Sequence, residues 1–202
     1  MARTFKRSPS SLAVLGLLYE RPMHPYLMQQ LIKERGKEKV INMERRASLY
    51  QTISQLQQAG LIRVRETVRE ERRPERTVYE LTDEGSQTLQ NWLREALSTP
   101  AKEFPEFPAA ISFLPLLSMD DVRQQLETRA GTLVGMMRQI EETLRTSSSY
   151  VPRLFLLEDE YLLVTLEAEL RWVQSLVDDL RTGRLTWNEA WLRKYMSLEQ
   201  DG

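Results

Sequence analysis

The hydrophobic pattern of residues 48–85 constrains the fold tightly, because its period changes from that of a helix to that of a strand and back. Apolar residues recur at three- and four-residue spacing from Leu49 up to Gly60, a residue suited to the left-handed geometry that ends helices. Residues 61–65 and 77–81 then alternate apolar and polar side chains around an arginine-rich loop, and a new helical pattern follows. This order of helix, two-stranded ribbon and helix predicts a winged helix-turn-helix.

Two helical patterns precede this segment. Residues 12–19 are almost entirely apolar and follow serines and Pro9, which suit the start of a helix. The pattern stops before Pro22, because a residue that precedes proline is pushed out of helical geometry. A second, amphipathic pattern begins at Pro25. We therefore predict one N-terminal winged helix-turn-helix domain over residues 1–98.

The composition changes between residues 98 and 117, a segment called the strap below. Four prolines interleave there with three phenylalanines. Prolines break any long helix, yet the segment is too apolar for a free linker. We expect the strap to pack on the body of the protein, with a short helix around residues 109–116.

Two long helical patterns follow, over residues 122–144 and 162–180, separated by three serines. Their apolar positions keep a seven-residue rhythm, which is typical of helices that pair as coiled coils. The chain is thus predicted to be mainly α, with an all-helical C-terminal dimerisation domain over residues 99–202. The predicted homodimer interface consists of Leu126, Leu133, Met137, Ile140, Leu162, Leu166, Leu170, Val173 and Val177.

Several classes of protein are excluded by the residues that the chain lacks. It has no cysteine, which removes disulfides, thiolate metal sites and cysteine nucleophiles. Its single histidine has no partner for zinc ligation, and neither a phosphate-cradling glycine loop nor a nucleophile elbow is found. We predict no enzyme, no cofactor and no metal. The N-terminus does not resemble a secretory signal and no stretch is apolar enough to span a membrane, so a cytoplasmic protein is expected.

The charge is divided unevenly along the chain. Residues 1–99 carry 17 basic and 12 acidic side chains, whereas the remaining 103 residues carry 11 and 17. Such an asymmetry indicates a nucleic-acid-facing part joined to a part that does not bind nucleic acid. The expected partner is double-stranded DNA.

The helix that ends at Gly60 carries no charged residue between positions 48 and 60. Its polar face holds Tyr50, Gln51, Ser54 and Gln55, and glutamine can pair bidentately with adenine. A plain neutral solvent face is the alternative, but surface helices normally carry many charges. We predict that this face enters a DNA groove and that Arg45 and Arg46, just upstream, contact phosphates.

The loop between the two strands holds Arg72, Arg73 and Arg76. Glutamates alternate with these arginines and weaken their field, so a solvated charge run is the alternative. The position of the loop, directly after a helix and a strand, favours a wing that contacts DNA phosphates.

The tryptophans and the strap phenylalanines have two interpretations. They either line a pocket for a flat apolar ligand or, as is more usual for large aromatic residues, anchor the core and the dimer interface. Trp92 is the exception, because it lies at the joint between the two predicted domains. We single it out as a candidate ligand-pocket residue.

Three blocks of the first half carry a resemblance: LAVLGLLYERPMHPYLMQQLI, SLYQTISQLQQAGLI and TVYELTDEG. Together, in this order, they resemble the PadR family of bacterial transcriptional regulators, and the second half is similar to the helical C-terminal region of its longer members. The resemblance implies a winged-helix repressor that dimerises through its C-terminal helices and often responds to a small aromatic ligand.

The resemblance also assigns residues. It places Ser48 and Tyr50 on the recognition helix, His24 and Tyr26 at the start of the second helix, and Arg72 and Arg76 on the wing. The chain departs from the family pattern at Pro25, where glycine is usual, and in lacking the customary wing glycine. From residues alone, His24 is expected either to cap its helix or to touch a phosphate.

These patterns predict a homodimeric, sequence-specific DNA-binding regulator, more often a repressor. The resemblance implies that a small aromatic ligand relieves the repression. The alternative is a winged-helix module that docks another protein without specific DNA binding. The operator sequence, the regulated genes and the effector are not readable from one sequence.

Overall fold

The computed structural model describes residues 7–41, 46–68 and 76–188. The chain divides into two compact units, Met1–Lys102 and Glu103–Gly202, which are described separately below. The predicted domain boundary at residues 98 and 99 lies at the end of a helix in the first unit. The described chain is mainly helical with a two-stranded antiparallel sheet, which confirms the predicted fold class.

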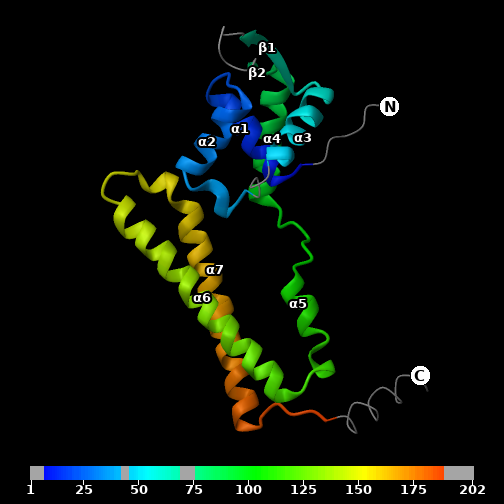
Figure 1. Ribbon diagram of the computed structural model, residues 1–202, viewed down its shortest axis with the longest axis vertical. Helices are drawn as coiled ribbons and strands as arrows, with labels where there is room; N and C mark the ends of the chain where they lie inside the picture. Colours follow the sequence, from blue (N-terminus) through cyan, green and yellow to red (C-terminus); the bar gives the residue numbers. More distant parts are fainter. Residues whose placement is uncertain (1–6, 42–45, 69–75, 189–202) are drawn as a thin grey trace, which may run out of the picture. The chain divides into compact units, whose positions relative to one another are not determined.

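The first unit is built from helices and a β-hairpin that lies at one end of the unit (Figure 1). Its elements are α1 (Pro9–Glu20), α2 (Pro25–Glu34), the short 3₁₀ turn η1 (Lys37–Lys39), α3 (Arg46–Gln58), β1 (Ile62–Val68), β2 (Arg76–Leu81) and α4 (Asp83–Ser98).

Side-chain caps determine where three of these helices begin. Ser8 forms a capping box with Ser11 at the start of α1. His24 caps α2, and Thr82 caps α4 by accepting a hydrogen bond from the Gly85 N–H at 3.0 Å. The apolar faces that follow meet in one core, formed by Val14, Leu15, Leu17, Leu18, Met23, Met28, Ile32, Leu49, Ile53, Leu56, Leu61, Ile62 and Leu89.

The hairpin is longer than the alternating patterns of the sequence suggested. β1 and β2 pair from Ile62 opposite Leu81 to Val68 opposite Arg76, with an irregularity between Val64 and Glu66. That irregularity leaves one extra residue on β1, as in a β-bulge. On its other edge, β2 is bridged by Met23 at the end of the α1–α2 connection.

The second unit is a helical hairpin with an additional N-terminal segment (Figure 1). Its elements are α5 (Glu106–Ile111), η2 (Leu114–Leu116), α6 (Met119–Ser147), η3 (Arg153–Phe155) and α7 (Leu157–Thr182). The Ser118 hydroxyl caps α6, and Gly183, with a φ of 71°, ends α7 in left-handed geometry.

Helices α6 and α7 lie side by side along their lengths (Figure 1) and enclose the core of this unit. Its buried residues are Val122, Leu126, Leu133, Val173 and Val177. Across the described ranges, every helix is too short or too polar to traverse a bilayer. Within the same ranges, no group of three acidic or histidine side chains is arranged to hold a metal ion.

Candidate nucleic-acid interface

Helix α3 presents an uncharged polar face to solvent. Leu49, Ile53 and Leu56 are buried on its inner side, which leaves Tyr50, Gln51, Ser54 and Gln55 exposed. Tyr50 is 54% exposed although it is a large aromatic residue. The predicted contact residue Ser48 is half-buried, and its carbonyl accepts a hydrogen bond from the Thr52 hydroxyl at 2.9 Å. The exposed face can therefore donate and accept hydrogen bonds without competing charges.

The start of α2 presents a histidine and a tyrosine. The Nδ1 atom of His24 accepts a hydrogen bond from the Leu27 N–H at 3.0 Å, so the proton of the neutral ring is on Nε2. The Tyr26 ring, which is exposed, stacks near His24 with ring centroids 6.2 Å apart. Pro25 is buried at the first helical position. His24 thus caps its helix, as one of the two sequence hypotheses expected, and still has an Nε2–H that can donate to a phosphate.

Residues of β2 lie close to both helices. Burial and, second, the positive charge of Arg76 lower the pKa of His24. Burial and then Tyr50 raise the pKa of Tyr79, so Tyr50 of α3 lies within electrostatic range of β2. The Met23 and Tyr79 backbones exchange two hydrogen bonds of 3.1 Å, which tie the start of α2 to the strand. The structure therefore gathers side chains from α2, α3 and β2 in one region of the unit.

Two arginines of β1 are candidate phosphate contacts that the sequence analysis missed. Arg63 Nε lies 2.7 Å from Glu80 Oε1, and Arg65 Nη1 lies 3.8 Å from Glu80 Oε2. Both arginine side chains are more than half exposed, whereas Glu80 is 21% exposed. One carboxylate therefore holds two guanidinium groups on the outer side of the hairpin. The alternation of residues 61–65 places both arginines on the polar face of the strand, and this pattern could have identified them as candidate contacts.

The remaining predicted contacts are only partly described. Arg76 begins β2 and is half-buried, and Arg46 is the first residue of α3. Arg45, Arg72 and Arg73 lie outside the described residues. Their role at the interface stays a prediction.

The His24 cap predicts a pH dependence of stability. Because the pKa of His24 is below its ordinary value of 6.5, the folded chain favours the neutral ring. This stabilisation is fully present above an unfolded-state pKa of about 6.5 and is lost as the pH falls through that value toward the lowered pKa of the folded state. We expect the thermal midpoint of the N-terminal unit to drop between about pH 7.5 and about pH 5.5.

His24→Asn is the matched variant, since asparagine keeps a capping acceptor but does not titrate. Its thermal midpoint should change less than that of the parent over the same pH interval. Equal changes in parent and variant would assign the pH dependence to other groups.

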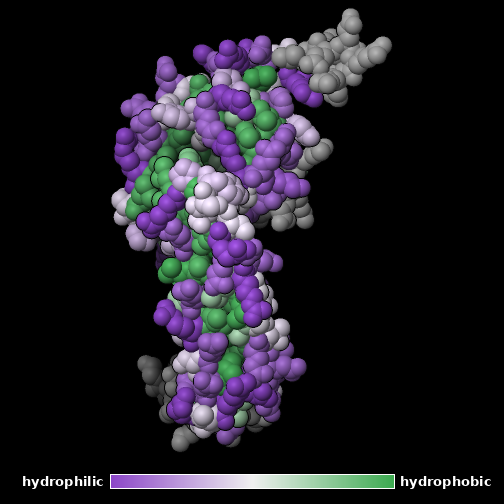
Figure 2. All heavy atoms as spheres, turned by 90° about the vertical axis from the view of Figure 1, so that its left-hand side faces the viewer, coloured by the Kyte–Doolittle hydropathy of each residue, from purple (hydrophilic) through white to green (hydrophobic). Residues whose placement is uncertain are grey.

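In the second unit, α7 has two apolar faces. One face packs against α6 through Val173 and Val177. The other carries Leu157, Tyr161, Val164 and Trp172, which are between 44% and 69% exposed. Their four-, three- and eight-residue steps place them on one side of the helix, opposite the buried valines. Figure 2 shows apolar side chains exposed among hydrophilic ones along this helical pair.

The nine residues predicted for the dimer interface are all buried or half-buried within one chain, and their role in a dimer stays a prediction. Five are buried: Leu126, Leu133, Ile140, Val173 and Val177. The other four, Met137, Leu162, Leu166 and Leu170, are half-buried. The buried five have almost no surface to offer a partner in this arrangement. A heptad rhythm specifies that two helices pair, but not that the second helix belongs to another chain.

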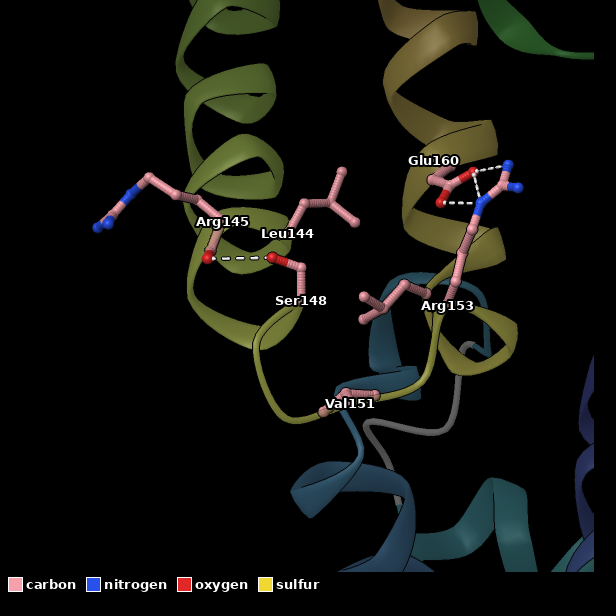
Figure 3. Close-up of a pocket in the computed structure, with 7 residues that line it drawn as sticks. Leu144, Arg145, Ser148, Val151, Arg153 and Glu160 are labelled. Carbon is pink, nitrogen blue, oxygen red and sulfur yellow. Dashed lines mark hydrogen bonds and ion pairs between the residues drawn. The ribbon is translucent and has the colours of Figure 1, made fainter.

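A hollow of about 430 Å³ opens where α6 turns into α7 (Figure 3). Leu144 and Val151 line it, together with the buried Leu156, and the Arg145 side chain points away from it. At its edge Arg153 pairs with Glu160, with Nε and Nη2 at 2.9 and 2.8 Å from the carboxylate. The proposed pocket residue Trp92 lies elsewhere, half-buried against the core of the first unit.

Comparison with protein families gives one match in this region. Residues 14–91 match the model of the Transcriptional regulator PadR-like family. This range runs from α1 into α4, so it contains every predicted DNA-contact residue. Trp92 lies one residue beyond its end. The match confirms the resemblance, and it is to a family of regulators rather than of enzymes. A comparison with curated proteins finds no match.

Solved structures share the fold over most of the chain. Bacillus subtilis PadR in complex with operator DNA is similar with a TM-score of 0.68 and 18% identity, over 87% of this chain and 99% of that chain. The same protein in complex with p-coumaric acid has a TM-score of 0.66 and 18% identity, over 86% of this chain and 99% of that chain. The Vibrio cholerae virulence activator AphA has a TM-score of 0.65 and 16% identity, over 86% of this chain and 98% of that chain.

Proposed function

We propose that this protein binds operator DNA as a homodimer and represses transcription, because residues 14–91 match the model of the PadR-like family of transcriptional regulators. A small aromatic ligand relieves the repression. Bacillus subtilis PadR, which shares the fold, is in complex with operator DNA in one structure and with p-coumaric acid in another.

The observation that carries the proposal is the uncharged exposed face of α3, in a unit that also presents arginines on β1 and a histidine at the start of α2. Tyr50, Gln51, Ser54 and Gln55 are of the size and chemistry that read base edges in a major groove. His24 on α2 and Arg63 and Arg65 on β1 are donors suited to phosphates, which position a protein without reading sequence.

The proposed dimer uses the exposed apolar face of α7. One recognition helix reads only a short stretch of DNA, so two copies with half-sites about 34 Å apart supply the missing affinity and specificity. Leu157, Tyr161 and Val164 are exposed apolar residues in a row on a polar helix, a pattern that marks protein interaction surfaces.

The test begins with DNA selected from a random pool by the full chain. We expect Arg63→Gln with Arg65→Gln to weaken binding to selected and unrelated DNA by a similar factor, on the order of tenfold, because phosphate contacts carry no sequence information. The slope of log affinity against log salt should fall by about two, one for each lost contact. Fluorescence anisotropy over a salt series measures both quantities.

Two further variants sharpen this test. Gln51→Ala with Gln55→Ala should lose the preference for selected DNA while the salt slope stays unchanged. Arg94→Gln, on the exposed side of α4, is the control for removing a positive charge. If the parent itself shows no preference over random DNA, the protein-docking alternative replaces the proposal.

A further inference from the structure

The carboxylate of Glu80 on β2 faces two arginines of β1. Glu80 is the direct cross-strand partner of Arg63, whose Nε lies 2.7 Å from Glu80 Oε1. Arg65 is the extra residue that the bulge leaves on β1, and its Nη1 lies 3.8 Å from the other carboxylate oxygen, Oε2. Each oxygen of one carboxylate therefore faces a different guanidinium group.

The three side chains differ in how far they are enclosed. Arg63 and Arg65 are 70% and 54% exposed, whereas Glu80 is 21% exposed. Among the hydrogen bonds of the described residues, Arg63 donates only its Nε–H, and Glu80 accepts it. A guanidinium group has five N–H donors, so the four on the two Nη atoms of Arg63 are left for an acceptor in solution.

The strand that carries both arginines is accessible. Within the described sheet β1 pairs with β2 alone, whereas β2 is also bridged by Met23 on its other side. Strand β1 therefore forms the open edge of the hairpin. Two guanidinium groups on an open edge can contact the phosphates of a DNA backbone without any movement of the strand.

The shared carboxylate also reduces the entropic cost of such contacts. Arginine has many rotamers, and each long side chain that becomes ordered during binding lowers the affinity. Because Glu80 contacts both Arg63 and Arg65, it orders two side chains before DNA arrives. Two guanidinium groups and one carboxylate keep a surplus of one positive charge, so the attraction to phosphate persists.

We propose that Glu80 is a positioning residue for the phosphate contacts of the hairpin. It holds Arg63 and Arg65 in the orientation in which their outer N–H groups bind the DNA backbone, and it does not contact DNA itself. This inference rests on the proposed function and deepens it, since it assigns a role to a carboxylate within a cationic surface.

Glu80→Asp in the full chain is the first test, because aspartate keeps the charge but is one methylene too short to hold both arginines. We expect binding to selected and unrelated DNA to weaken about fivefold, the cost of ordering the two side chains during binding. The slope of log affinity against log salt should stay unchanged, since no charge is lost. Glu84→Asp, at the exposed start of α4, is the matched control and should bind like the parent.

The same replacement is then made in the variant Arg63→Gln with Arg65→Gln. Glu80→Asp should have no effect on DNA affinity there, because the side chains through which it acts are gone. An equal loss of affinity in this background would assign Glu80 to the fold of the hairpin. Unchanged or tighter binding of the single variant Glu80→Asp would mean that Glu80 only competes with phosphate. Either result would overturn the proposal.

The second test measures exchange of the arginine Nε–H hydrogens with water by NMR, without DNA. A hydrogen held by a carboxylate exchanges slowly, so the Arg63 Nε–H should exchange more slowly than that of Arg138, an exposed arginine of α6. In Glu80→Asp the two rates should become similar. Equal rates in the parent contradict the positioning role of Glu80, whereas a parent that binds no DNA contradicts the proposed function.

Discussion

Replacing Gly85 with alanine is expected to destabilise the N-terminal unit by about 3 kcal/mol or more, because no side-chain rotation can relieve the clash. A Cβ atom at this position would lie 1.9 Å from the Leu61 carbonyl oxygen and 3.0 Å from Leu81 Cδ1. The first turn of α4 rests there on the backbone that enters β1. Thr82 fixes this contact through its N–H and hydroxyl, which lie 3.1 and 3.0 Å from the same Leu61 oxygen.

Urea unfolding followed by circular dichroism measures the effect. Gly16→Ala in α1 is the matched control, because a Cβ there meets no atom within 4 Å. Alanine is a better helix former than glycine, so the control should gain up to about 1 kcal/mol. If both variants unfold at the urea concentration of the parent, the close approach of α4 to Leu61 is not part of the folded structure in solution.

If the proposed dimer forms through this face of α7, the double variant Tyr161→Glu with Val164→Glu is expected to be a monomer. Its affinity for the proposed operator should fall at least about 100-fold, since two unpaired charges per chain would be buried at the interface. Both residues lie on the exposed face of α7, more than 60% exposed, so the fold of the single chain should tolerate the change. Sedimentation equilibrium measures the oligomeric state, and anisotropy measures DNA binding.

Gln174→Glu places one negative charge on a polar, exposed position of the same helix and should leave the proposed dimer intact. The heptad pattern alone would have pointed to Leu166 and Val173 for such a test. Val173 is fully buried against α6, so a charge there is expected to unfold the hairpin rather than separate two chains. A dimer that persists in the double variant places the interface elsewhere.

The N-terminal unit could be predicted closely because its signals are local. The change of hydrophobic period between residues 48 and 85 predicted a helix followed by a hairpin, which the structure places at α3 and at β1 and β2. Capping residues identified the starts of helices for the same reason. A Thr82 or His24 side chain bonds to a backbone amide three residues away, so the sequence contains both partners.

In the second unit the two long helical patterns are confirmed as α6 and α7, whereas the residues predicted for the dimer interface stay a prediction because the pattern is ambiguous. The rhythm of α6 and α7 indicates helix pairing but does not name the partner, and intrachain packing uses the residues assigned to the dimer. Tyr161 and Val164 can be assigned to a separate exposed face only because the structure shows which side of α7 packs against α6. The Phe107 ring contacts Arg129 and Trp172, which lie 22 and 65 positions further along the chain, and no local spacing predicts these contacts.

Sequence by itself determined the class of fold, the uncharged face of α3 and the absence of cysteine chemistry, because periodicity, capping and composition are properties of neighbouring residues. Tertiary structure alone decided that α7 pairs with α6 in the same chain, that Glu80 holds Arg63 and Arg65, and that Gly85 admits no side chain. These features depend on which distant segments meet. Such meetings follow from the packing of the whole chain rather than from any pattern along it.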